Sequence, residues 1–186
     1  MPPRRQSISR AAVTVFKYGM KRDFNLWLAS LGPTAPVKTL TELRNYNLAN
    51  QARGAIKYGQ AQFDISDEMN LVTDGARYEA DRARDLHLSR TTGIDAVLKA
   101  NNLDAIIFPG SSGAGISAKA GYPTVIVPFG FVPNAPTPLF PDGFNAKDQP
   151  YGISFAGTAC TEPRLIELAY AFEQGTKRRV APPDLP

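Results

Sequence analysis

A pair of serines in a glycine-rich segment is the part of this sequence that comes nearest to a catalytic motif. Residues 110–113 read Gly-Ser-Ser-Gly and follow a short apolar run. A serine nucleophile needs a base within hydrogen-bond reach and N–H donors for the oxyanion. The backbone around Ser112 offers donors, and Ser117 and Lys119 lie close enough in sequence for a Ser-Lys arrangement. Lys119 stands between alanines on an expected short helix, however, so we favour a structural turn over a catalytic serine.

Other residue types that carry chemistry are sparse. The single histidine, His87, lies in a charged helical pattern without a nucleophile motif, which favours a surface or satisfied interior histidine over a general base. One histidine and one cysteine are too few for a multi-histidine or thiolate metal site. The acidic residues Asp64, Asp67 and Glu68 favour a solvated face over a ligand set. We therefore predict no catalytic residue, no metal and no cofactor.

A Gly-Tyr-Pro turn follows the expected short helix. Gly121 is expected to end that helix with a positive φ, and Pro123 to begin a strand where no ladder donor is needed. Tyr122 can either pack against the neighbouring strands or line a substrate cleft, and we favour packing. The candidate substrate-binding residues are accordingly Ser111, Ser112 and Tyr122.

Two short apolar runs on either side of this region predict the strands that position it. Both runs are β-branched and uncharged, which is typical of strands buried on both faces within an α/β layer structure. We expect three strands and three principal helices, at 104–108, 123–128, 151–155, 10–31, 74–99 and 162–176. Thr39 and Glu42 have the spacing of a capping box for a further helix. Phe24 and Trp27 are predicted core residues of the first helix.

Length and composition indicate a globular protein. The chain has 186 residues, of which 43% are apolar and 20% charged, enough for one sizeable core. We predict a single domain over 1–186 with disordered tails at 1–9 and 180–186. No secretory signal and no run of about 18 apolar residues is present, so we expect a cytoplasmic protein that binds no membrane. Cys160, the only cysteine, is expected to be a buried filler.

Several separated segments resemble the amidase signature enzymes, which hydrolyse amides with a serine, a second serine and a lysine. Each segment alone is weakly specific, but their order matches the C-terminal portion of that family. The matching segments are Phe-Lys-Tyr-Gly-Met-Lys-Arg-Asp-Phe-Asn-Leu-Trp-Leu at 16–28, Tyr-Gly-Gln at 58–60, Leu-Asp-Ala-Ile-Ile-Phe-Pro at 103–109, Ala-Gly-Tyr-Pro-Thr-Val-Ile-Val-Pro at 120–128, Tyr-Gly-Ile-Ser-Phe-Ala-Gly at 151–157 followed by Glu-Pro at 162–163, and Ala-Tyr-Ala-Phe-Glu-Gln at 169–174. The resemblance covers nearly the whole chain after about residue 12.

The chain departs from the family in its catalytic apparatus. The family's nucleophile follows in a Gly-Ser-x-Arg setting, and no such segment occurs in this sequence. The Gly-Ser-Ser-Gly of 110–113 occupies a different place, where family members have a variable loop beside the pocket. The resemblance thus implies an α/β fold with part of the family's mixed sheet, about three strands covered by helices, and no catalytic residue is carried over.

Three functions stay open from the sequence. The first is the C-terminal segment of an amidase-type hydrolase of carboxylic amides, inactive alone, which would meet a small amide substrate once a catalytic half completes it. The second is a non-catalytic, truncated amidase paralogue that acts as a binding or assembly partner. Self-association through exposed sheet edges is expected in either case. The third, a basic nucleic-acid module, is disfavoured: the net charge of +4 comes with no aromatic interleaving or known motif.

Overall fold

The computed structural model describes residues 8–135, 139–144 and 146–181, with side chains from residue 14 onward. The chain divides into two compact units, Met1–Asp85 (unit 1) and Leu86–Pro186 (unit 2), which are described separately. The single-domain assignment stays a prediction. Of the predicted tails, residues 1–7 and 182–186 lie outside the described residues.

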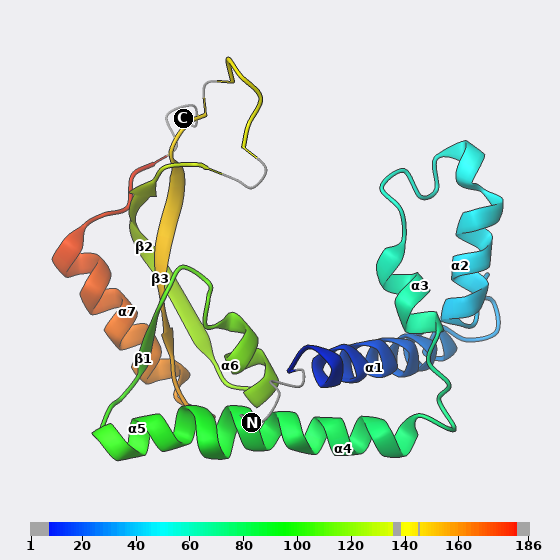
Figure 1. Ribbon diagram of the computed structural model, residues 1–186, viewed down its shortest axis with the longest axis horizontal. Helices are drawn as coiled ribbons and strands as arrows, with labels where there is room; N and C mark the ends of the chain where they lie inside the picture. Colours follow the sequence, from blue (N-terminus) through cyan, green and yellow to red (C-terminus); the bar gives the residue numbers. More distant parts are fainter. Residues whose placement is uncertain (1–7, 136–138, 145, 182–186) are drawn as a thin grey trace, which may run out of the picture. The chain divides into compact units, whose positions relative to one another are not determined.

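Unit 1 is helical (Figure 1). Its elements are α1 (Ile8–Ser30), α2 (Leu40–Ala49), the short 3-10 helix η1 (Gln51–Arg53), α3 (Ala61–Asp67) and α4 (Gly75–Leu86), whose last residue begins unit 2. Half of the predicted capping box is confirmed, because Thr39 precedes α2 and its hydroxyl accepts a hydrogen bond from the Glu42 N–H at 3.1 Å, whereas the Glu42 carboxylate accepts from the Lys38 N–H at 2.6 Å and not from that of Thr39. The bond to the Thr39 hydroxyl is the one that matters for the helix start. This satisfies one of the N–H groups that a helix start leaves without a partner.

An aromatic stack joins α1 to α4. The rings of Tyr18 and Tyr78 stack with their centroids 4.6 Å apart, and the Tyr18 hydroxyl donates to the Leu71 carbonyl at 2.8 Å. The predicted core position of Trp27 is wrong, since this side chain is 54% exposed. Phe24 is half-buried and packs against Phe63. Apolar residues of α1 lie on more of its surface than the other helices of unit 1 cover. The spacing of these residues in the sequence does not say which of them pack against another helix.

Unit 2 contains the sheet. Its elements are the π-helical segment η2 (His87–Ile94), α5 (Asp95–Asn101), β1 (Ile106–Pro109), α6 (Ala114–Ala120), β2 (Thr124–Val132), β3 (Gln149–Ala156) and α7 (Glu162–Thr176). The long helix predicted at 74–99 is therefore built as α4, η2 and α5 in succession. Its irregular point is Gly93, where φ is −104° and ψ is −109°. A Cβ at Gly93 would come within 2.5 Å of the Leu88 carbonyl oxygen, so this local backbone path requires glycine.

The strands form an antiparallel sheet in the order β1-β3-β2 (Figure 1). One core lies on each face of this sheet. On one face α7 contributes Leu165 and Ala169 to a core with Val127 and Phe155. A second core consists of Ile94, Leu98 and Ala120, against which Ile106, Ile116 and Tyr122 pack. The predicted α/β fold with three strands covered by helices is confirmed.

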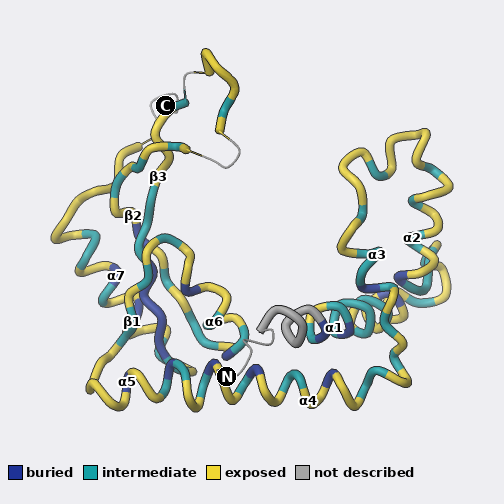
Figure 2. The backbone as a smooth tube through the Cα atoms, in the orientation of Figure 1, coloured by how far each residue is buried: buried dark blue, intermediate teal, exposed yellow. Residues whose placement is uncertain are grey.

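The burial of the first two strands differs from the prediction. Both were expected to be buried on both faces, yet Ile107 of β1 is 59% exposed and Ile126 of β2 is 55% exposed. β3 is the central strand, and its residues Ser154, Phe155 and Ala156 are all buried (Figure 2). An apolar, β-branched run identifies a strand but does not reveal whether the strand has one neighbour or two.

The turn before α7 also differs from expectation. Cys160 is exposed and adopts a positive φ of 63°, so it is not the buried filler that the sequence suggested. Pro163 lies in the first turn of α7, as predicted. Within the described residues, no helix is both long and apolar enough to cross a membrane.

Candidate functional site

The Gly-Ser-Ser-Gly segment forms a tight turn directly after β1. Gly110 has φ 54°, a conformation that favours glycine, and its N–H donates to the Gly152 carbonyl of β3 at 2.8 Å. The Ser112 N–H donates to the Pro109 carbonyl at 3.1 Å, and the Ala114 N–H to the Ser111 carbonyl at 2.9 Å. Two of the backbone donors considered for an oxyanion are therefore engaged within the turn. Both serine side chains are exposed.

Neighbouring side chains hold this turn against the sheet. The buried hydroxyl of Ser154 donates to the Gly110 carbonyl. Gly113 lies so close to the Phe108 ring that a Cβ there would come within 2.3 Å of it. The backbone of the turn is thus fixed on both sides, while the hydroxyls of Ser111 and Ser112 face outward.

The two residues considered as partners of Ser112 lie on α6. Ser117 is 2% exposed, and Lys119 is half-buried. Residues two apart on a helix do not share a face, so Ser117 and Lys119 are not a Ser-Lys pair with each other. The burial of Ser117 also keeps its hydroxyl away from any substrate in solvent.

Tyr122 packs into the second core of unit 2 and forms a polar contact there. Its hydroxyl donates to Asp95 Oδ2 at 3.1 Å, and the Arg90 guanidinium lies 5.2 Å from the ring centroid. Burial, together with the hydrogen bond to Asp95 and its charge, raises the pKa of Tyr122, while the Arg90 charge opposes this shift. The turn before it is as predicted, since Gly121 ends α6 with φ 67°. This environment favours the packing alternative for Tyr122.

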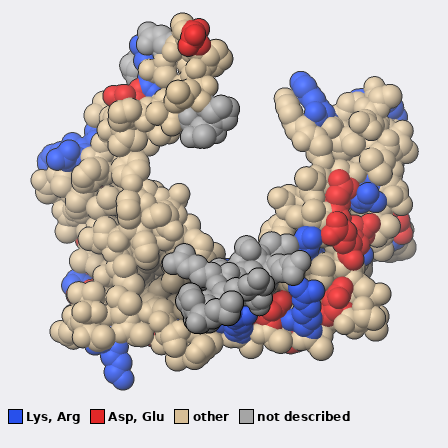
Figure 3. Space-filling view, in the orientation of Figure 1, with Lys and Arg blue, Asp and Glu red and all other residues tan. Residues whose placement is uncertain are grey.

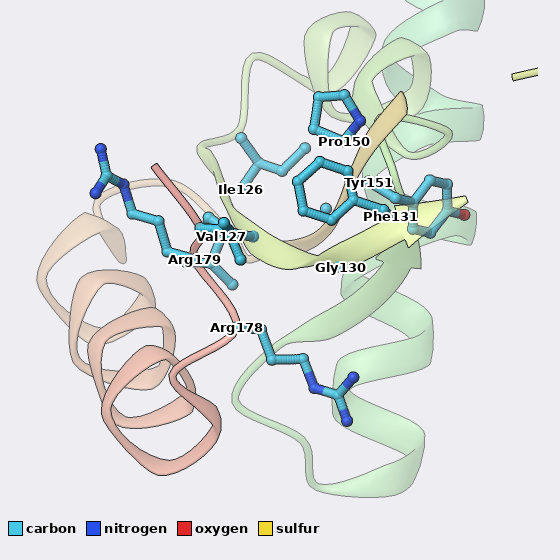
Figure 4. Close-up of a pocket in the computed structure, with 11 residues that line it drawn as sticks. Ile126, Val127, Gly130, Phe131, Pro150, Tyr151, Arg178 and Arg179 are labelled. Atoms are coloured by element: carbon cyan, nitrogen blue, oxygen red, sulfur yellow. The ribbon is translucent and has the colours of Figure 1, made fainter. Parts of the chain in front are cut away.

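A pocket of about 450 Å³ lies on β2 and β3 beside the segment that follows α7 (Figure 4). Apolar side chains line most of it, including Ile126, Phe131 and Tyr151. Arg178 and Arg179 also line it, but their guanidinium groups point in different directions in Figure 4, and that of Arg178 lies over the Phe129 ring at 5.2 Å. The pocket therefore suits an apolar group, because it has no pair of convergent cations to hold a carboxylate.

Tyr151 links the pocket to the serine turn. It lines the pocket, and its ring carbon Cε2 would lie 3.3 Å from a Cβ built on Gly110. The serine turn and the apolar pocket thus meet at one end of the sheet. The sequence predicts a strand at Tyr151 but no site there, because alternation along a strand does not identify which loop a side chain covers.

The acidic residues of α3 and its end are ion-paired. Lys21 Nζ lies 3.1 Å from Asp67 Oδ1, Lys17 pairs with Glu68 at 3.0 Å, and Arg44 pairs with Asp64. The predicted solvated face is thus wrong for Asp67, whose side chain is only 13% exposed. Acidic and basic side chains gather on this part of unit 1 in Figure 3.

The Asp67 carboxylate is stabilised in its charged form. Burial acts to raise its pKa, but hydrogen bonds from Thr41 and Lys21 and the charges of Lys21 and Arg44 outweigh burial, so the pKa is lowered. Among the described residues, no group of three or more metal-ligating side chains is gathered. This cluster therefore ties α1, α2 and α3 together as a structural network.

The known proteins to which this chain is similar are amidases. The chain is 32% identical over 163 residues to a probable amidase of Arabidopsis thaliana, covering 87% of this chain and 28% of that protein. The structure superposes on the native peptide amidase of Stenotrophomonas maltophilia with a TM-score of 0.75 and 32% identity, over 92% of this chain and 34% of that one. A peptide amidase solved with the competitive inhibitor chymostatin gives a TM-score of 0.72 and 31% identity, over 91% of this chain and 34% of that one. No family model matches the sequence.

The fold of this chain is that of an amidase segment, because the aligned region includes nearly all of it. The chain belongs to the amidase signature family, as the sequence resemblance predicted. It spans about a third of the length of the solved relatives and 28% of the Arabidopsis protein, which fits the expected C-terminal portion.

Proposed function

We propose that this chain is the pocket-forming C-terminal portion of an amidase-type hydrolase, and that the serine and lysine apparatus lies in residues outside this sequence. One observation carries the proposal: 92% of the chain superposes on a peptide amidase, but that match takes up only 34% of the peptide amidase. Amide hydrolysis by this family requires a serine nucleophile with its base, and the turn at 110–113 offers no identified base. No catalytic residue is assigned to this chain.

In this proposal the chain contributes substrate contacts and no proton transfer. The nucleophilic serine would attack the amide carbonyl, the C–N bond would break with a proton passing to the leaving amine, and water would then hydrolyse the acyl-serine ester. The pocket beside Tyr151 would hold an apolar group of the substrate, and the exposed hydroxyls of Ser111 and Ser112 would hydrogen-bond its polar backbone. Peptide-like amides are the proposed substrate class, since the solved relatives are peptide amidases.

The first test uses the isolated chain with a panel of aryl amides and esters. We expect no turnover above background, because no nucleophile and base pair is identified in the chain. The control variants are Ser112→Ala and Lys119→Ala. Turnover by the parent chain that both substitutions abolish would show that the serine turn is catalytic after all.

A second test reads the transcript across the start codon. The expected result is a longer reading frame that encodes the lysine, the serine loop and a Gly-Ser-x-Arg segment. The extended protein should hydrolyse peptide amides, and Tyr151→Ala in that protein should raise KM more than it lowers kcat, since the residue binds substrate without taking part in bond breaking. An extended protein that carries these residues and yet has no amidase activity contradicts the proposal.

The alternative is a non-catalytic paralogue that acts as a binding or assembly partner. The exposed apolar residues of unit 2, Ile107 and Ile126 among them, favour this alternative, since such residues commonly lie in interfaces. A transcript with no upstream catalytic segment, together with stable complex formation in cell extracts, would favour the paralogue.

A further inference from the structure

The segment that follows α7 forms one side of the pocket on β2 and β3. Strand residues, among them Ile126, Phe131 and Tyr151, line the pocket from the sheet. Residues 178–180, called the strap below, line it from outside the sheet, and Figure 4 shows the side chains of Arg178 and Arg179 on this segment. The pocket is therefore enclosed in part by chain that belongs to neither strand.

A single residue with left-handed backbone joins α7 to the strap. The helix ends at Thr176, and Lys177 adopts φ 48° and ψ 41°. The Lys177 N–H donates to the Glu173 carbonyl at 2.8 Å, which is the single hydrogen bond that closes this type of helix end. The chain leaves the helix at Lys177, so the hydrogen bonds of α7 do not hold the strap in place.

One side-chain contact ties the strap to the folded core. The Arg178 guanidinium lies 5.2 Å from the centroid of the Phe129 ring, within the range of a cation–π contact. Phe129 stacks in turn on Phe172 of α7, with the ring centroids 6.4 Å apart, and Phe172 packs against the core of unit 2. Among the described residues, no backbone hydrogen bond joins 178–181 to β2 or β3. The strap is thus attached at Arg178, to a ring that the core holds still.

An attachment of this kind favours a closed strap without locking it. All residues of the strap are exposed, and Val180 is 65% exposed. An exposed cation–π contact shifts an equilibrium about two- to fivefold, which corresponds to about 0.5–1 kcal/mol. Segments with few buried contacts and no backbone hydrogen bonds open at low free-energy cost. A ligand that touches the strap can therefore change how often it is closed.

We propose that the strap closes over an uncharged apolar group bound in the pocket, and that the contact between Arg178 and Phe129 is the latch of this closure. A group in the pocket touches the strap and the strands together, so it favours the closed position, and the closed strap favours binding by the same factor. A cationic group is outside this ligand class, because Arg178 and Arg179 already place two positive charges beside the pocket. Assigning the bound group to an amide substrate rests on the proposed function, whereas the closing of the strap does not.

The experiment measures trypsin cleavage between Arg179 and Val180 in this chain, by mass spectrometry, with and without the uncharged apolar dye N-phenyl-1-naphthylamine. The initial rate follows the population of the open strap when opening is fast relative to cleavage. We expect saturating dye to slow the cleavage, because the dye binds the closed form. At the same dye concentration, Arg178→Gln should be cleaved about two- to fivefold faster than the parent chain, since it lacks the latch. Each rate is divided by that of a synthetic peptide of residues 174–186 with the same substitution, which removes the effect of the altered sequence on trypsin itself.

The matched control is Lys177→Gln, which removes the neighbouring positive charge at a residue that does not line the pocket. It should be cleaved at the parent rate. Phe129→Leu removes the other half of the latch and leaves the sequence of the strap unchanged, so it should match Arg178→Gln. The double variant should be cleaved no faster than either single variant, because both substitutions remove the same contact.

Two kinds of result overturn the proposal. Cleavage that the dye leaves unchanged means that pocket and strap are not coupled. Equal acceleration by Lys177→Gln, or additive effects in the double variant, means that the contact with Phe129 is not the latch. If Phe129→Leu fails to fold, as judged by circular dichroism, Arg178→Gln and its control still decide the question. Protection by the dye without amide turnover by the extended protein supports the strap and counts against the proposed function, and turnover without protection does the reverse, so the two failures are distinguishable.

Discussion

The contacts within unit 1 differ in kind from the contacts within unit 2. The helices of unit 1 meet through ion pairs and aromatic contacts, whereas the strands and helices of unit 2 meet through buried aliphatic and aromatic side chains. Figure 3 shows the same contrast at the surface, where charged side chains gather on unit 1 and the visible face of unit 2 is largely uncharged. The two units should therefore respond to different perturbations: the stability of unit 1 to pH, and the stability of unit 2 to lost packing.

The largest expected effect is in unit 2. Phe155 is 6% exposed, and its ring lies edge-to-face with that of Phe172 of α7, with the two ring centroids 6.1 Å apart. We expect Phe155→Ala to reduce the free energy of unfolding by about 3–5 kcal/mol, through lost burial and a remaining cavity. Urea denaturation followed by circular dichroism measures it.

The control for this variant is Ile166→Ala, on the same helix as Phe172 but 57% exposed. It should change the free energy of unfolding by less than about 1 kcal/mol, because its side chain is mostly in water already. Equal effects of the two substitutions would mean that the core between β3 and α7 does not govern the stability of unit 2.

A smaller effect is expected at Tyr122, where unit 2 includes a polar contact. Tyr122→Ala should destabilise the chain by roughly 2–4 kcal/mol, because it removes a half-buried aromatic ring from the second core. Tyr122→Phe keeps the ring and removes only the hydrogen bond to Asp95, so about 1 kcal/mol is expected. An unchanged denaturation midpoint in Tyr122→Ala would contradict packing and favour the alternative that Tyr122 lines a substrate cleft.

The smallest of the three effects concerns unit 1 and its dependence on pH. Asp67→Asn should cost about 1–3 kcal/mol at neutral pH, since it removes charge-assisted hydrogen bonds from Thr41 and Lys21. Because the folded-state pKa of Asp67 is lowered, its contribution is present above the unfolded pKa of about 3.9 and is lost as pH falls through the folded value. The parent chain should therefore lose stability more steeply than Asp67→Asn below about pH 4.

The matched control in unit 1 is Glu68→Gln. Glu68 pairs with Lys17, but its side chain is 64% exposed, so solvent screening limits the expected cost to less than about 1 kcal/mol. If Glu68→Gln matched Asp67→Asn in size and in pH dependence, the contrast between a screened and a half-buried ion pair would not hold. Thermal unfolding at several pH values and two salt concentrations makes the comparison.

Local patterns in the sequence predicted most of the fold. Apolar runs bounded by proline and glycine gave the strands, and the Thr39 cap and Gly121 terminus lie where their residue types require. Burial was harder to predict. Trp27, Ile107 and Cys160 are exposed because exposure depends on which neighbours are present, and a residue's own type and spacing carry no information about them.

The candidate site was predictable only in part. The turn at 110–113 was visible as Gly-Ser-Ser-Gly, whereas the pocket beside it is lined by residues from β2, β3 and the segment after α7. Those segments come together only through strand pairing between residues such as Val127 and Ile153, which are distant in sequence. Asp67 was misplaced for the same reason, since its partners Lys21 and Arg44 come from other helices.

The exposed thiol of Cys160 has a practical consequence for every measurement of association. An accessible thiol oxidises readily, and two copies of the chain can then be joined covalently through an intermolecular disulfide, whatever their strand edges do. A dimer band on a non-reducing gel would report air oxidation at the turn before α7. Sedimentation in the presence of a reductant, or with Cys160→Ser, separates this artefact from association through exposed sheet edges. The same thiol is a unique position for attaching a fluorophore, because the sequence contains no second cysteine to compete for the label.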